Sequence, residues 1–269
     1  MRVRDVQVHH IRALIDRMRL AGLSGSTIRG TVAACSALLR FGVHRGWGTK
    51  NAVSELDGDL PSAQRTTEPV YLTRLEIDSL LRDLGDEFRP VASVCAFAAL
   101  RISECLGLTW ADVDFAEGTL SITKQLSRDG KELTALKTRS SEAVLSLPAP
   151  LAAELRSHRE RQARISFERV KPEQLVFQTR TGNPQSKRNA LRAVQMVAER
   201  LGLRNAEGEL LGLHDLRHST AGLLREAGLP DEEIALVLRH ANVRTTSVMY
   251  GSRSDEGRAV RERAAAALG

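Results

Sequence analysis

The residues best suited to chemistry lie in the segment 214–250, which reads HDLRHSTAGLLREAGLPDEEIALVLRHANVRTTSVMY. His214 and Arg217 are three residues apart, so on a helix they share one face. Tyr250 follows His240 by ten residues. Arginine and histidine supply positive charge and hydrogen-bond donors for an oxyanion, and the tyrosine hydroxyl can act as a nucleophile. The segment therefore has the residue types needed for attack on a phosphate.

Two helices must position these side chains. The first contains His214 and Arg217, and a second should begin at Pro230 or Asp231, with acidic residues in its first turn, and end near Arg239. The end of this second helix would then present the next residue, His240.

A zinc site is the alternative interpretation of the two histidines His214 and His218, which have the i, i+4 spacing of a metal-binding pair. However, Asp215 stands where a zinc protease would carry its catalytic glutamate. Arg217 would repel a cation, and no third ligand has a convincing position. We therefore predict no metal site and interpret His218 as a neighbouring or core histidine.

Two upstream segments also carry charged residues in unusual settings. Arg101 ends the uncharged run VASVCAFAAL and is followed by ISECLGLTWADVDF. A charge at this place needs a partner or a ligand, and Glu104 could supply an ion pair. Lys137 lies in LKTRSSEAVLSLP, near the tip of an expected hairpin. A solvated loop lysine is the alternative there, and the neighbours Lys124, Lys131 and Arg139 leave the register open.

Taken together, these segments resemble the tyrosine recombinases, the phage integrase family. The order arginine, lysine, H-x-x-R, L-x-H and tyrosine is the family's order, and the resemblance covers nearly the whole chain. The resemblance implies six catalytic residues: Arg101, Lys137, His214, Arg217, His240 and Tyr250. The family usually has glycine two residues before the first arginine, whereas this chain has Ala99, a departure that concerns the local turn.

The resemblance also implies the reaction, which is site-specific DNA recombination or integration. Tyr250 would attack a phosphodiester and form a 3′-phosphotyrosyl link, with His214 as the base. Lys137 would protonate the leaving 5′-oxygen, while the arginines and His240 stabilise the phosphorane. No cofactor or metal is implied. The implied partners are double-stranded DNA and a homotetramer on paired DNA sites. An inactive DNA-binding relative and a type IB topoisomerase are the alternatives.

The distribution of charge agrees with a nucleic-acid partner. Residues 1–50 hold nine Lys/Arg against two Asp, while the remaining 219 residues are almost neutral. A basic helical segment is typical of proteins that bind polyanions, although a solvated charged surface would look the same. We predict DNA contacts from the following residues: Arg29, Arg40, Arg45, Lys187 and Arg188.

The predicted fold is mixed and predominantly α-helical with a small antiparallel β-sheet. We expect three regions: a partial helical core-binding domain at 1–60, a linker at 61–72, and a catalytic domain with a C-terminal tail helix at 73–269. Family members usually carry a further helix before the first region, so the resemblance implies a short N-terminal region.

Periodicity and caps predict the elements. Helices are expected at 7–21, from 24 or 26 to 45, 73–83, from 87, 149–165, 186–201 and 256–268, strands between 119 and 147, and a short strand with a turn in LVFQTRTGNP.

Other classes are disfavoured by composition. No apolar stretch approaches the ~20 residues that span a bilayer, and the charged start lacks the apolar core of a signal peptide. Aromatic residues make up only 4%, too few for a base-stacking platform. The cysteines Cys35, Cys95 and Cys105 have no C-x-x-C spacing, which favours free thiols in a reducing compartment. We therefore expect a cytoplasmic protein without a membrane partner.

Overall fold

The computed structural model describes residues 2–56, 58, 60–62, 71–136, 142–205, 208–239 and 255–269. The chain divides into two compact units, Met1–Glu68 and Pro69–Gly269. Each unit has its own hydrophobic core, and the two are described separately below.

The first unit is a pair of helices, α1 (Val8–Leu20) and α2 (Gly25–His44), with short 3-10 turns η1 (Val3–Asp5) and η2 (Ala52–Glu55). Gly22, at φ 70°, makes the turn after α1, and the Ser24 hydroxyl accepts the Thr27 N–H at 3.3 Å to cap α2. Both helices lie where the sequence predicts them. The core of this unit consists of Ile11, Ile15, Ile28, Val32, Leu39 and Ala52.

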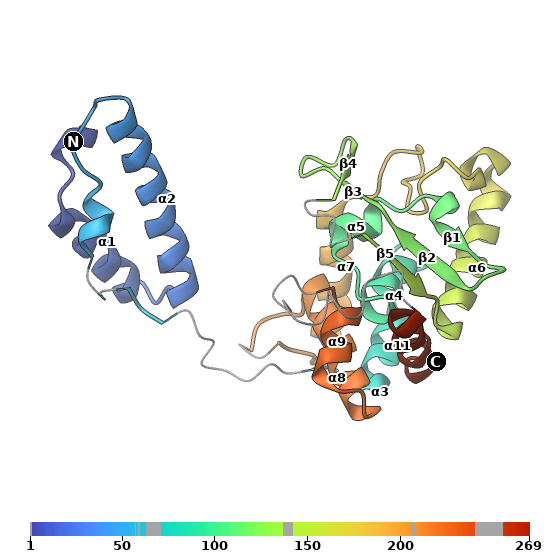
Figure 1. Cartoon of the computed structure of the whole chain (residues 1–269). Coiled ribbons are helices and arrows are strands. Elements are labelled where there is room, and N and C mark those ends of the chain that lie inside the picture. Colours follow the sequence, from blue (N-terminus) through green and yellow to red (C-terminus); the bar gives the residue numbers. More distant parts are fainter. Residues whose placement is uncertain are drawn as a thin grey trace. The chain divides into compact units, whose positions relative to one another are not determined.

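The second unit is built mainly of helices around α4, which contacts α3, α5, α6, α7 and α8 (Figure 1). The helix bounds are α3 Arg74–Asp83, α4 Arg89–Phe97, α5 Ile102–Leu106, α6 Ala149–Ile165, α7 Lys187–Arg200, α8 Leu213–Glu226, α9 Asp231–Val237 and α11 Asp255–Ala267. The short 3-10 elements are η3 Trp110–Asp112 and η5 Phe167–Val170.

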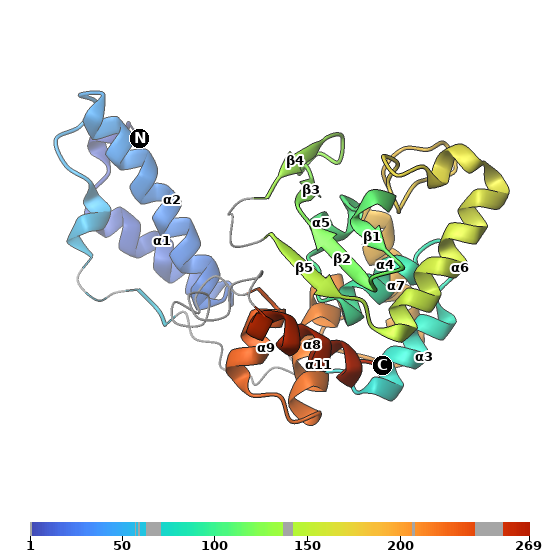
Figure 2. The same cartoon turned by 45° about the vertical axis from the view of Figure 1, so that its right-hand side comes forward.

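Local sequence explains why these helices begin and end where they do. Thr73 and Glu76 form the expected capping box at the start of α3, with the Thr73 N–H donating to the Glu76 carboxylate at 2.8 Å. Every residue of α4 from Pro90 to Phe97 is buried, which accounts for its lack of a polar face. The C-terminal helix α11 lies beside α9 and β5 (Figure 2).

The strands form two small antiparallel sheets rather than the single sheet expected from the sequence. One has the order β1-β2-β5, and the other pairs β3 with β4. Their bounds are β1 Val113–Asp114, β2 Thr119–Ile122, β3 Lys124–Leu126, β4 Leu133–Ala135 and β5 Ala143–Ser146. The alternation of side chains is the same in one sheet or two, so the pattern could not reveal the break at residue 123.

The prediction of a strand in LVFQTRTGNP is wrong. Residues 175–184 form no strand, and their β-type pairing is limited to two isolated bridges, Thr109 with Leu175 and Gln178 with Pro184. The Gln178 side chain donates to the carbonyl of Leu175 at 2.6 Å and to that of Arg169 at 3.1 Å. The Gln178 side chain thus takes the place of the main-chain N–H donors that a neighbouring strand would supply to such carbonyls.

Helix α8 is held to its neighbours by polar contacts as well as by apolar packing. The Thr220 hydroxyl donates to the Ala96 carbonyl of α4 at 2.6 Å. The Leu72 N–H donates to the Ser219 hydroxyl at 2.9 Å. Gly222 lies so close to Tyr71 that an added Cβ would come within 2.6 Å of its side chain. These contacts fix the rotation of α8 about its axis.

The remaining structural expectations concern cysteines and membranes. Cys95 and Cys105 are buried free thiols, and Cys35 is a partly exposed one. In the portion of the chain that the structure describes, no helix is both long and apolar enough to cross a bilayer.

The close contact between α5 and β3 generates a test of the fold. A Cβ at Gly107 would lie 2.8 Å from the backbone of Gln125 and Leu126, neither of which can rotate away. Gly107→Ala should therefore lower the free energy of unfolding by about 1–3 kcal/mol, the usual range for overpacking. Equilibrium urea unfolding measures the change.

The matched control is Gly85→Ala, because no atom lies within 4 Å of a Cβ built at Gly85. It should change the free energy of unfolding by less than about 0.5 kcal/mol. Equal stability of the two variants would contradict the packing described for Gly107.

Candidate active site

The centre of the site is the Arg217 guanidinium on α8, which is only 1% exposed. Its Nη1 donates to the main-chain carbonyl of Ala99, and its Nη2 donates to that of Leu238. Burial of a charged group requires such partners. Arg217 therefore joins the turn before Arg101 to the end of α9.

A second connection runs through Glu104, which is 2% exposed. Its Oε1 accepts Arg101 Nη1 at 2.9 Å, and its Oε2 accepts the Arg101 backbone N–H at 3.0 Å. The same Oε2 accepts Arg239 Nη2 at 2.7 Å. The carboxylate thus caps α5 and holds two guanidinium groups, one of which, on Arg101, is 40% exposed.

Positive charge exceeds negative charge in this cluster. Three guanidinium groups, those of Arg101, Arg217 and Arg239, surround the single carboxylate of Glu104. Burial, together with the charges of Arg239 and Arg101, lowers the pKa of Arg217 to about 10, so it remains protonated at neutral pH. The formal charges of these four side chains therefore sum to +2. The arrangement suits a bound phosphodiester.

His214 adds a proton acceptor to this surface. It is exposed on α8, and its ring lies edge-on to that of His218, with centroids 4.4 Å apart. Partial burial, then the charges of His218, Arg217 and Arg101, lower the pKa of His214, and Asp215 opposes this only in part. The imidazole is therefore neutral near pH 7 and can accept a proton.

The backbone is strained in both of the segments that Arg217 contacts, the turn at Ala99 and the end of α9. Ala99 has φ 49° and Arg239 has φ 54°, and among the residues that the structure describes they are the non-glycine ones with positive φ. Such conformations cost about 1–3 kcal/mol each and gather at functional sites. The Ala99 turn thus keeps a backbone that glycine would adopt easily, despite the alanine.

The structure brings three of the predicted catalytic residues together: Arg101, His214 and Arg217. The other three, Lys137, His240 and Tyr250, lie outside the described residues. Arg101 also pairs with Glu104, as the ion-pair interpretation of that segment predicts. The pair leaves Arg101 partly exposed, so the ion pair and a role in anion binding are compatible.

Alternative assignments become weaker on this geometry. Lys124 is engaged by the buried carboxylate of Asp112, at 2.6 and 2.8 Å, and is therefore a poor substitute for Lys137. Asp215 accepts the Gly212 N–H at 2.7 Å and so caps α8. Within the described ranges, no group of three or more His, Cys, Asp or Glu could hold a metal ion.

The residues predicted to contact DNA differ in their exposure and in their contacts with the protein. In the first unit, Arg29 donates to the Pro61 carbonyl at 2.6 Å, and the Arg45 guanidinium lies over the Phe41 ring. Arg40 is exposed. In the second unit, Lys187 and Arg188 line a hollow of about 560 Å³ between α5, the β3–β4 turn and the start of α7.

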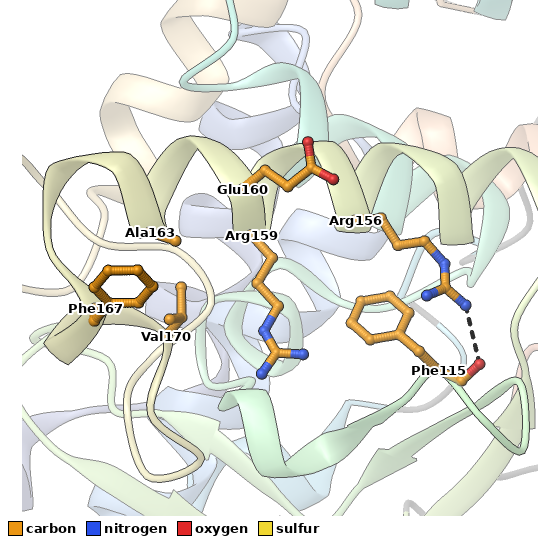
Figure 3. Close-up of a pocket in the computed structure, with 7 residues that line it drawn as sticks. All are labelled: Phe115, Arg156, Arg159, Glu160, Ala163, Phe167 and Val170. Carbon is orange, nitrogen blue, oxygen red and sulfur yellow. Dashed lines mark hydrogen bonds between the residues drawn. The ribbon is translucent and has the colours of Figure 1, made fainter.

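A separate pocket of about 430 Å³ lies beside α6 (Figure 3). Arg156 donates to the Phe115 carbonyl at 3.0 Å, and Arg159 lies over the Trp110 ring. The lining residues are Phe115, Arg156, Arg159, Glu160, Ala163, Phe167 and Val170. None of them belongs to the charged cluster around Arg217.

Two residues of the cluster have contacts that the sequence did not predict. The sequence indicates Glu104 only as a partner of Arg101, and Arg239 only as a helix end. A signal existed for Glu104, because it is the one charged residue between Arg101 and Asp112. For Arg239 the sequence offers only its place between Leu238 and His240.

Comparison with known proteins agrees with the geometry. Residues 72–256 match the model of the Phage integrase family, which covers more than half of the chain. The chain therefore belongs to the phage integrase family, the tyrosine recombinases, whose members are enzymes that cleave and rejoin DNA.

Curated relatives are similar at modest identity. A "Tyrosine recombinase XerC-like" protein of Caldanaerobacter subterraneus subsp. tengcongensis is 23% identical, over 93% of this chain and 68% of that protein. The tyrosine recombinase XerC of Xylella fastidiosa strain 9a5c is 25% identical, over 88% of this chain and 74% of its own length.

Solved structures show the same fold. The Tn1549 transposon integrase in complex with a circular intermediate DNA has a TM-score of 0.68 at 20% identity, covering 97% of this chain and 86% of that one. A lambda integrase dimer bound to a COC′ core site has a TM-score of 0.63 at 18% identity, covering 95% and 66%. The mixed, predominantly helical fold predicted from the sequence is confirmed.

The electrostatics of His214 generate a pH prediction. Its imidazole resonances should titrate by NMR with a midpoint below the ordinary histidine value of about 6.5. His218→Gln removes a nearby group that disfavours the protonated form, so the midpoint for His214 should rise in this variant. A midpoint that does not move would exclude His218 as a cause.

The basic residues generate a prediction about salt. Each phosphate contact that is lost should reduce the slope of log affinity against log salt by about 0.9. Arg40→Glu and Lys187→Glu should each flatten this slope, as measured by fluorescence anisotropy with duplex DNA. Arg82→Glu, on α3, is the control surface charge. An unchanged slope in either test variant would mean that the residue is only solvated.

Proposed function

We propose that this recombinase cleaves and rejoins DNA with Tyr250 as its nucleophile, in a site formed by Arg101, Lys137, His214, Arg217 and His240. The observation that carries the proposal is the net positive charge of the four side chains Arg101, Glu104, Arg217 and Arg239, next to a neutral His214. A phosphodiester supplies the missing negative charge, and the charge on oxygen grows in the phosphorane that attack produces.

The roles follow from the chemistry of each group. His214 accepts the proton of the Tyr250 hydroxyl as the oxygen attacks phosphorus, giving a 3′-phosphotyrosyl link. Lys137 protonates the departing 5′-oxygen. Arg101, Arg217 and His240 stabilise the phosphorane. Arg217 donates one N–H of each Nη to a main-chain carbonyl, and its remaining N–H groups are the donors proposed for the phosphate oxygens.

No nucleotide or metal is needed for this sequence of steps. The phosphotyrosyl bond retains the energy of the broken phosphodiester, so the free 5′-hydroxyl of another strand can attack it in the reverse reaction. The guanidinium groups neutralise the charge that a metal would neutralise in other phosphoryl transfers.

We further propose that duplex DNA contacts both units. Residues 1–60 would act as a core-binding domain, 61–72 as the linker, and 73–269 as the catalytic domain. Arg29, Arg40 and Arg45 would contact phosphates from the core-binding domain, and Lys187 and Arg188 from the catalytic domain. A homotetramer on two paired sites, working in the cytoplasm, is the proposed assembly. Each solved relative described above was bound to DNA.

The test of the nucleophile uses a duplex that the protein itself selects from a random-sequence pool. A set of copies with a nick at each successive position lets the short cleaved fragment leave, so that a covalent adduct accumulates. The wild-type protein should give an adduct that survives denaturation, and Tyr250→Phe should give none. An adduct with Tyr250→Phe would show that another residue attacks.

The role of Lys137 is tested on the same duplex with sulfur in place of the bridging 5′-oxygen. Loss of a general acid slows a reaction by about 10²–10⁴-fold. A thiol has a pKa near 8.5 and leaves without an acid. Lys137→Ala should therefore be slow on the oxygen substrate and close to the wild-type rate on sulfur. Arg217→Ala should be slow on both.

Equal impairment of Lys137→Ala on the two substrates would mean that Lys137 only contacts phosphate. The acid would then have to be sought at Lys131, Arg139 or His218, since Lys124 is engaged by Asp112.

A further inference from the structure

One carboxylate connects two segments that are far apart in the sequence. Glu104 accepts hydrogen bonds from Arg101, in its own turn, and from Arg239, just after α9, through a contact of 2.7 Å. The Arg239 and Glu104 side chains are 4% and 2% exposed, so this ion pair is shielded from water. Shielded pairs hold their geometry far better than surface pairs do.

The backbone conformation of Arg239 is one in which a residue with a side chain is uncommon. A left-handed residue directly after a helix is commonly glycine, because other side chains are strained there. Arg239 occupies this conformation at φ 54° and turns its side chain inward to Glu104. The local fold alone would favour glycine, so the contact with Glu104 compensates for the strain.

We propose that Arg239 is a positioning residue for the cleavage reaction: through Glu104 it fixes the chain just before His240 against the turn that carries Arg101. The inference rests on the proposed function. Arg239 follows the last turn of α9, so its pairing with Glu104 holds that end of the helix at the turn of Arg101. Arg217 adds a parallel connection, from Ala99 to Leu238.

The pair also governs the charge state of Glu104. Burial acts to raise its pKa, but the charge of Arg239 and hydrogen bonds from Arg101 and Arg239 bring the pKa below its ordinary value. Among the residues that the structure describes, Arg217 and the Cys105 thiol are further ionisable groups near this carboxylate. Without Arg239 the pKa of Glu104 rises, so the carboxylate becomes protonated at a higher pH and loosens its hold on Arg101.

The experiment compares adduct formation in a single turnover across pH, on the selected and nicked duplex. The variants are Arg239→Gly, which suits the left-handed backbone, and Arg239→Lys, which keeps the charge. The matched control is Arg161→Ala, because Arg161 forms a half-buried pair with Glu154 at 2.8 Å on α6, outside the site. Thermal melting and DNA affinity are measured for every variant.

Arg239→Gly should slow adduct formation by about 10–100-fold, since a misplacement of ~1 Å can cost about that much. DNA affinity should fall by a smaller factor than the rate, because the Arg239 side chain is only 4% exposed and binds Glu104. The acid limb of the pH profile should move to higher pH, and Arg239→Lys should recover part of the rate. In a Glu104→Gln background, Arg239→Gly should add little further loss, because the two act through each other.

Other results would contradict the positioning role of Arg239. If the wild type forms the adduct and Arg239→Gly forms it equally fast with the same pH profile, the inference fails and the proposed function stands. If the loss is the same in Arg161→Ala, or adds in full to that of Glu104→Gln, Arg239 is not a positioning residue. A wild-type protein that forms no adduct overturns the proposed function and this inference with it.

Discussion

The arrangement of the charged cluster depends on the guanidinium of Arg217, which is only 1% exposed. A group of this size and charge cannot be buried without partners, and it obtains them from two main-chain carbonyls, those of Ala99 and Leu238. The turn after α4 and the end of α9 must therefore meet at α8. These segments contain the residues next to Arg101 and Arg239, so the requirement to satisfy one cation also brings the guanidinium groups of Arg101, Arg217 and Arg239 into one cluster.

The same cluster illustrates how stability and function are balanced. Two left-handed residues, Ala99 and Arg239, are retained beside three guanidinium groups that share one carboxylate. Strain and like charge both oppose formation of this cluster, and the single carboxylate offsets only part of the charge. In the proposed function, a bound phosphodiester would offset more of it. The remainder of the unit, with its apolar α4 and its capped helices, supplies the stability that permits this arrangement.

Much of this architecture could be predicted from local sequence. The capping box at Thr73, the turn at Gly22 and the H-x-x-R spacing of α8 are short-range features, and each determines structure within a few residues. The break between the two sheets and the irregular course of 175–184 depend on contacts with distant segments, so alternation alone misleads there. The pairing of Glu104 with Arg239 spans 135 residues, and only the fold brings these side chains together.

The start of the second unit is attached to the helix that carries the central arginine. Leu72 donates to Ser219, Tyr71 packs on Gly222, and the Arg225 guanidinium lies over the Tyr71 ring. All three partners belong to α8, and Ser219 is two residues from Arg217. A substitution at Ser219 or Gly222 would therefore disturb two features at once: the anchoring of residues 71 and 72, and the placement of Arg217 on the same helix.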